Sequence, residues 1–241
     1  MMYEENSLKD IAMTAQGKLI VIDGTDGSGK TVQTMRLIAR LRNEGHHVEL
    51  TDFPQYGKPS AYFVEEYLRK GTYGSPADVG AYRASIFYAL DRYDASFQMR
   101  KWLDEGVIIV SNRYVSANMG HQAGKIEDKA ERERFLAWLK DFEFGIMGIP
   151  KPDVNILLYM PPEQGQLLAS GTAAVARKGA SSDAHEKDIN HLRHASEAFL
   201  EVAKKESWKI IDNRKDEMGG LKSLDVVHEE IYAHIKSCGM L

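Results

Sequence analysis

Residues 24–31 read Gly-Thr-Asp-Gly-Ser-Gly-Lys-Thr and match the pattern G-x-x-x-x-G-K-[S/T] at every fixed position. An apolar run at Lys18–Asp23 precedes this segment, and helical periodicity at Lys30–Asn43 follows it. A phosphate-binding loop requires this order of strand, loop and helix. Glycines let the backbone approach phosphate oxygens, and the helix amino terminus adds partial positive charge. The segment therefore predicts a nucleotide phosphate site; the alternative is a turn that only caps a helix.

The residue types of the loop predict how it would hold ATP. Lys30 supplies a point charge to the β- and γ-phosphates, and the Thr31 hydroxyl is placed to bind Mg²⁺. Asp26 is a candidate for a direct catalytic or metal role, whereas Asp23 is either a similar group or a strand-end carboxylate that orders the loop. The residues expected to bind ATP are Gly24, Thr25, Asp26, Gly27, Ser28, Gly29, Lys30 and Thr31.

Short runs rich in Val and Ile alternate with stretches of helical periodicity, which is typical of a parallel sheet buried on both faces. The expected strands are Lys18–Asp23, His47–Asp52, Val107–Ser111, Val154–Met160 and Trp208–Ile211. Together with the loop they predict an α/β protein with the three-layer P-loop NTPase fold: a five-stranded parallel sheet, helices on both faces and a mobile lid.

Helical periodicity predicts three helices and leaves two segments without a pattern. The apolar positions expected on one helix face are Met35, Leu37, Ile38 and Leu41, followed by Gly45 at the helix end; Ile189, Leu192, Phe199 and Val202 mark a second helix, and Leu224, Val227, Ile231 and Ile235 a third. The Gly-, Ala- and Ser-rich residues 164–188 are expected to form the lid. Residues 1–16 are expected to be a flexible extension, and 17–241 a single nucleotide kinase domain.

Composition narrows the class of protein. The chain has 241 residues, of which 43% are apolar and 27% charged, as in ordinary globular proteins. A net charge of −4 argues against a protein that binds nucleic-acid polymers. No apolar stretch is long enough for a membrane helix, and the only cysteine, Cys238, allows no intrachain disulfide. We therefore expect a cytoplasmic protein with no membrane or nucleic-acid partner.

A phosphate loop does not by itself separate kinases from ATPases or switches, so the acceptor is argued from other segments. Phe53-Pro54-Gln55-Tyr56-Gly57 and Asn112-Arg113-Tyr114-Val115-Ser116-Ala117-Asn118 each follow an expected strand, and Tyr88-Ala89-Leu90-Asp91-Arg92 lies in an expected long helix. Ligands of open α/β sheets bind at the carboxyl ends of the strands, where the first and second of these segments begin.

With these segments in this order, the chain resembles the thymidylate kinase family from about Lys18 to its end. The marks are VIDGTDGSGKT, FPQYG, FYALDR, NRYVSAN and KPDVNILLYMPPE. The resemblance implies that the chain transfers the γ-phosphoryl group of ATP to dTMP with Mg²⁺ as cofactor, and that it forms a homodimer. The chemistry of the phosphate loop makes Thr31 and Asp26 the metal candidates and Lys30 and Asp26 catalytic candidates, and Arg113 of the acceptor segment is a further one. Because the phosphate loop contains no arginine, Arg177 in the expected lid is the candidate cation for the transferred phosphoryl group.

The same resemblance implies roles for residues on the acceptor side. Tyr88 would stack on the base, Arg92 would hydrogen-bond its edge and Asn118 would reach it, and Arg113 would hold the acceptor phosphate. Phe53, Tyr56 and His121 would complete the substrate site. The alternatives are a core aromatic for Tyr88, half of a surface ion pair for Arg92, a structural salt bridge for Arg113 and an ordinary histidine for His121.

The chain departs from the family pattern at two positions. Asn112 stands where the family has an aspartate that helps to organise Mg²⁺, and asparagine carries no charge. Gln55 stands where many members have a basic residue beside the acceptor phosphate. Two alternatives therefore stay open: a related kinase for another pyrimidine nucleotide or nucleoside, and an ATP-binding module with weakened transfer.

Overall fold

The computed structural model describes residues 16–171, 189–215 and 220–241. Its centre is one sheet of five parallel strands in the order β2-β3-β1-β4-β5. The strands are β1 (Lys18–Gly24), β2 (Val48–Asp52), β3 (Ile108–Asn112), β4 (Val154–Tyr159) and β5 (Lys209–Asp212). The prediction of a five-stranded parallel sheet is confirmed, with strand bounds within a residue or two of those expected.

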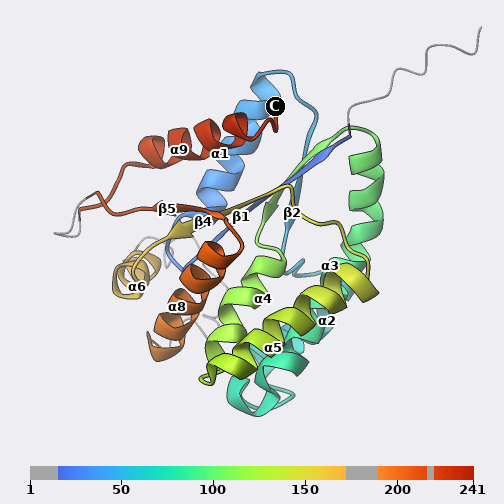
Figure 1. The fold of residues 1–241 in the computed structure, drawn as a ribbon, viewed down its shortest axis with the longest axis vertical. Coiled ribbons are helices and arrows are strands. Elements are labelled where there is room, and N and C mark those ends of the chain that lie inside the picture. The colour runs from blue at the N-terminus through green and yellow to red at the C-terminus, as the bar shows by residue number, and fades with distance from the viewer. Residues whose placement is uncertain (1–15, 172–188, 216–219) are drawn as a thin grey trace, which may run out of the picture.

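Successive residues of β1 explain why helices cover both faces. Side chains alternate across a strand, so Leu19 and Val21 join one buried cluster while Ile20 and Ile22 join the other. Both sets are fully buried. A central strand that is apolar at every position needs cover on each side, which gives the helix–sheet–helix layers seen in Figure 1.

The helices divide between these two faces (Figure 1). One face carries α1 (Lys30–Asn43) and α9 (Leu224–Ser237), whereas α3 (Pro76–Asp104), α4 (Val115–His121), α5 (Lys129–Lys140) and α8 (Ile189–Lys205) supply the other cluster. The remaining elements are α2 (Tyr62–Glu65), α6 (Pro162–Gly171), the 3-10 turns η1 (Pro59–Ala61) and η3 (Ala123–Lys125), and the π-helical turns η2 (Glu66–Lys70) and η4 (Asp141–Ile146).

The predicted helices are confirmed, with two errors in their apolar faces. Helix α1 has the expected bounds, and Gly45 ends it with a φ of 92°. Met35 was expected in the core but is 51% exposed, because the buried face of α1 runs through Thr34, Leu37, Ile38 and Leu41. Leu224, the first residue of α9, is likewise 51% exposed.

Two expected segments are described only in part. The segment predicted as a lid is helical in α6 as far as Gly171, and residues 172–188 lie outside the described residues. The predicted catalytic Arg177 falls in that gap, and the expected N-terminal extension is described only at Gln16. Among the helices that the structure describes, none is both long and apolar enough to cross a membrane.

Candidate active site

The phosphate loop connects central strand β1 to helix α1. Gly27 and Gly29 have φ values of 77° and 82°, in the left-handed region that glycine favours. A Cβ on Gly27 would also lie 2.3 Å from the carbonyl oxygen of Gly165 in α6. The Thr25 hydroxyl donates to the Met160 carbonyl at 2.7 Å and accepts from the Met160 amide at 2.9 Å. Contacts with β4 and α6 therefore fix the loop before any ligand is considered.

Lys30 is held inside this loop. Its Nζ donates to the carbonyls of Gly24 at 3.0 Å and Thr25 at 2.8 Å, and lies 3.7 Å from a carboxylate oxygen of Asp26. Burial, assisted by the nearby Arg113 guanidinium, lowers the pKa of Lys30 to about 8. An ammonium group so poorly solvated is well suited to bind phosphate, because little water has to be removed from it.

Arg113 joins the phosphate loop to the acceptor side. Its Nη2 donates to Asp26 Oδ1 at 2.9 Å, and its Nη1 lies 3.0 Å from Nε2 of His121. Burial opposes ionisation of Asp26, but Lys30 and Arg113 outweigh it and hold the pKa of that carboxyl well below its usual range. The backbone of Arg113 has a φ of 64°, which is uncommon for a residue other than glycine and typical of functional positions.

His121 is a neutral acceptor in this chain of contacts. Burial and the adjacent Arg113 lower the pKa of His121 well below its ordinary value. Because the guanidinium can only donate, Nε2 of His121 must accept, which puts the imidazole proton on Nδ1. The ring also packs edge-on against Phe199 at 5.2 Å. The structure thus brings Lys30, Asp26, Arg113 and His121 together, as expected.

Asp23 orders the loop from beneath. It is 1% exposed; its Oδ1 accepts from the Gly24 amide at 2.8 Å and its Oδ2 from the Ser116 hydroxyl at 2.7 Å. Burial raises the pKa of Asp23, although Arg113 and Lys30 oppose the shift. Both carboxylate oxygens therefore act within the protein, as in the loop-ordering alternative.

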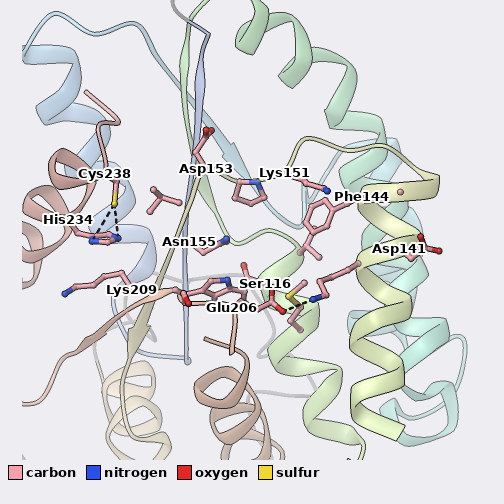
Figure 2. A pocket seen from close by; sticks show the side chains of 18 residues that line it. Ser116, Asp141, Phe144, Lys151, Asp153, Asn155, Glu206, Lys209, His234 and Cys238 are labelled. Carbon is pink, nitrogen blue, oxygen red and sulfur yellow. Dashed lines mark hydrogen bonds and ion pairs between the residues drawn. The ribbon is translucent and has the colours of Figure 1, made fainter. Parts of the chain in front are cut away.

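Ser116 also lines a separate cavity of about 650 Å³ at the amino ends of β4 and β5, shown in Figure 2. The cavity includes Lys140 and Glu206, which pair at 2.7 Å, together with Trp208. It lies outside the phosphate loop, because the amino ends of parallel strands are at the opposite edge of the sheet from their carboxyl ends.

Asn112 ends β3 beside the carboxyl end of β2. Its Nδ2 donates to Asp52 Oδ1 at 2.9 Å and lies 3.3 Å from the Thr31 hydroxyl. Its Oδ1 is buried and receives no hydrogen bond from the described residues. Burial raises the pKa of Asp52, while the Asn112 hydrogen bond opposes that shift. A carboxylate and a hydroxyl thus meet at the Asn112 amide nitrogen at this edge, and oxygen ligands of these two kinds fit Mg²⁺.

Three polar side chains on the acceptor side form a buried network. Arg92 donates from Nε and Nη2 to the two carboxylate oxygens of Glu143, both at 2.6 Å, and from Nη1 to the Tyr114 carbonyl at 3.3 Å. Asn118 Nδ2 lies 3.4 Å from Glu143 and 3.3 Å from the Ser85 carbonyl. Arg92 is thus half of an ion pair, but a buried one with Glu143 rather than a surface pair.

Aromatic residues of the acceptor segments lie in three different settings. Phe53 is 3% exposed and packs on Tyr114 with ring centroids 5.7 Å apart, so it belongs to the core. Tyr88 is half-buried, and its ring meets Tyr67 edge-on at 6.4 Å. Tyr56 is 42% exposed, with the Arg69 guanidinium 4.0 Å from its ring centroid. Substrate contacts of these aromatics stay predictions.

Sequence reasoning missed two acidic residues that organise this side. Glu143 holds Arg92 and Asn118; the available signal was a lone acidic residue within the apolar segment Phe142–Ile149. Asp91 holds the loop after β2, because it accepts from the Gln55 amide at 2.8 Å and from Ser60 Oγ at 2.6 Å. Gln55, where the chain departs from the family pattern, is therefore hydrogen-bonded to Asp91 of α3.

These features define a P-loop phosphotransferase. The parallel sheet has this strand order, the phosphate loop follows its central strand, and the Arg113 guanidinium lies beside that loop. The family model described as thymidylate kinase matches residues 22–230. The chain belongs to the thymidylate kinase family.

Curated relatives and a solved structure agree with this assignment. The thymidylate kinase of Mycobacterium tuberculosis is 28% identical over 77% of this chain and 85% of the relative. The human thymidylate kinase is 27% identical over 90% of this chain and 88% of its own length. A solved thymidylate kinase structure from Candida albicans shares the fold, with a TM-score of 0.68, 22% identity and 92% of each chain covered.

Proposed function

We propose that this protein transfers the γ-phosphoryl group of ATP to dTMP and forms dTDP, with Mg²⁺ bound to the donor. The observation that carries the proposal is the 2.9 Å contact of Arg113 with Asp26, because it puts an acceptor-segment cation beside the phosphate loop. Family membership supplies the acceptor, since the relatives that match most of the chain are thymidylate kinases.

The reaction needs two anions brought close together and shielded from water. Lys30 and the loop amides would bind the donor phosphates, and Arg113 would hold the acceptor phosphate by its planar fork. Tyr88 would supply a face for the base, while Arg92 and Asn118 would contact its edge. Thr31 and the polar residues at the ends of β2 and β3 would hold Mg²⁺, which offsets charge on the transferred group.

An acceptor panel tests this function directly. ADP release from Mg·ATP is coupled to a visible reaction, and dTMP, dUMP, dCMP, UMP, AMP and thymidine are compared at equal concentration. We expect dTMP to be the preferred acceptor and the Lys30→Met variant to be inactive. Turnover with thymidine but with no monophosphate would indicate a nucleoside kinase instead.

A second candidate is an ATP-binding module with weak transfer, and Asn112 is the observation that favours it. An amide cannot supply the charge of the family carboxylate at this position. Binding of ATP without any acceptor-stimulated ADP release would support the module and contradict the kinase.

We also propose a homodimer that uses α3. Leu90, Tyr93 and Phe97 are 38%, 38% and 53% exposed and recur at helical spacing, which forms an apolar stripe. Tyr93 and Phe97 contact each other edge-on at 5.2 Å. Light scattering should give twice the mass of the 27.1 kDa chain, and Phe97→Lys should give one chain mass.

A further inference from the structure

We infer that Asp52 supplies the carboxylate that positions Mg²⁺. The negative charge that the family has at the end of β3, where this chain has Asn112, would then lie at the end of β2. The inference rests on the proposed use of Mg·ATP. Strands β2 and β3 are parallel neighbours, and Asp52 is paired in register with Asn112 at their carboxyl ends. A carboxylate on either residue therefore faces the same edge of the sheet, next to Thr31.

The hydrogen bonds fix the orientation of the Asn112 amide. Nδ2 donates to Asp52 Oδ1 at 2.9 Å and lies 3.3 Å from Thr31 Oγ1; the carboxylate can only accept, so it selects the amide nitrogen, and the hydroxyl is compatible with that orientation. The amide oxygen is left on the other side, buried and without a donor among the described residues. Asn112 therefore presents its amide nitrogen, and not an oxygen ligand, to Asp52 and Thr31, which leaves the Asp52 carboxylate as the charged oxygen group of the pair.

Asp52 has the charge and the free atom that this role needs. Among the described residues, none donates a hydrogen bond to Asp52 Oδ2. The residue is exposed, whereas Asp23 is 1% exposed and uses both carboxylate oxygens within the protein. The carboxylate of Asp26 is engaged by Arg113 and lies near Lys30. Asp52 is thus the carboxylate beside Thr31 that forms no ion pair with a cation in the described part of the chain.

The test measures binding of the non-hydrolysable ATP analogue AMP-PNP by calorimetry, with MgCl₂ and with EDTA. In Asp52→Asn the new amide oxygen still accepts from Asn112, so the variant removes charge and retains the hydrogen bond. The half-saturating Mg²⁺ concentration should rise by about 10-fold or more, as for other groups that orient metal ligands. In EDTA the affinity should stay equal or improve, because a negative charge near the phosphates is gone.

Two further variants complete the experiment. Asp52→Asn with Asn112→Asp returns the charge to β3 and should recover most of the Mg²⁺ response. Glu49→Gln, on the same strand and with the same change of net charge, should leave it unchanged. Should Asp52→Asn fail to fold in thermal melts, Asp52→Ser gives the same comparison.

An unchanged Mg²⁺ requirement in Asp52→Asn would overturn the inference. Equal weakening with MgCl₂ and with EDTA would also overturn it, because that is the result of a purely structural role. No acceptor is present in these measurements. Failure of dTMP phosphorylation with intact Mg·AMP-PNP binding would therefore reject the proposed function and leave the role of Asp52 standing.

Discussion

The guanidinium of Arg113 donates to the carboxylate of Asp26 across 2.9 Å, although the two residues are 87 positions apart in the sequence. Asp26 belongs to the loop that would bind the donor, and Arg113 to the segment that would bind the acceptor. The same guanidinium reaches His121 at 3.0 Å, so its orientation is set from two sides. A side chain held in this way can meet an incoming anion with little loss of rotamer entropy.

Replacing Arg113 by Lys should separate charge from geometry. Lysine retains the positive charge but loses the planar fork, so we expect kcat with dTMP to fall by about 10²-fold or more while the affinity for ADP changes little. Steady-state kinetics and ADP titration measure the two effects. Arg214→Lys, in an exposed pair with Asp212, is the control. Equal loss of ADP affinity would show that Arg113 serves the donor loop alone.

Affinity for nucleotide should depend on pH through Lys30. Burial lowers its pKa to about 8, so the ammonium form that attracts phosphate dominates below that pH and is lost above it. The affinity for ADP in EDTA should therefore be constant from pH 7 to about 8 and then fall, by at most about tenfold per pH unit. Lys30→Arg should bind with no such fall, since arginine stays charged. A flat profile in the parent protein would contradict this assignment.

The contact of His121 with Arg113 predicts different KM values for two substitutions of His121. Gln can place an amide oxygen near Nη1, whereas Phe offers no acceptor. His121→Phe should raise the KM for dTMP by about fivefold to tenfold, because one hydrogen bond to a charged group is lost. His121→Gln should stay close to the parent. Equal KM values for the two variants would mean that the ring only fills space against Phe199.

The parts of the fold that depend on local sequence could be predicted. Strand β1 and helix α1 follow from an apolar run and a period of 3.6 residues, and Gly27 and Gly29 from the backbone that a phosphate loop requires. Met35 shows the limit, because it lies one position away from the buried Thr34 on the helix and points about 100° away from it.

The contacts between distant segments could not be predicted. Arg92 pairs with Glu143, 51 positions away, and Asn112 donates to Asp52, 60 positions away. The order of the strands and the packing of the helices bring these residues together. An acidic residue in sequence gives no sign of its partner. Sequence reasoning therefore identified Arg92 and Asn112 as important positions but missed the carboxylates that orient them.

The buried ion pair of Arg92 and Glu143 should be essential for stability. Both side chains are almost fully buried, and the two hydrogen bonds are 2.6 Å long. Glu143→Gln leaves the guanidinium charge buried beside a neutral partner, so the free energy of unfolding should fall by about 3–5 kcal/mol. Urea denaturation measures it. Glu133→Gln, in an exposed pair with Lys205, should have almost no effect. A small loss in Glu143→Gln would mean that water or relaxation solvates Arg92.

Gly27→Ala should damage the phosphate loop by more than the cost of placing alanine in a left-handed backbone conformation. The residue has a φ of 77°, and an added Cβ would lie 2.3 Å from the Gly165 carbonyl oxygen, a backbone atom that cannot rotate away. At Gly45 the φ is 92° but the space around a new Cβ is open, so Gly45→Ala isolates the cost of the left-handed backbone, about 1 kcal/mol.

Thermal melts and ADP titration of both variants separate the contributions. Gly45→Ala should retain ADP affinity, whereas in Gly27→Ala either the loop or α6 must shift, and ADP binding should be lost. Full binding by Gly27→Ala would show that α6 moves without disturbing the loop, and that the contact with Gly165 does not help to shape the phosphate site.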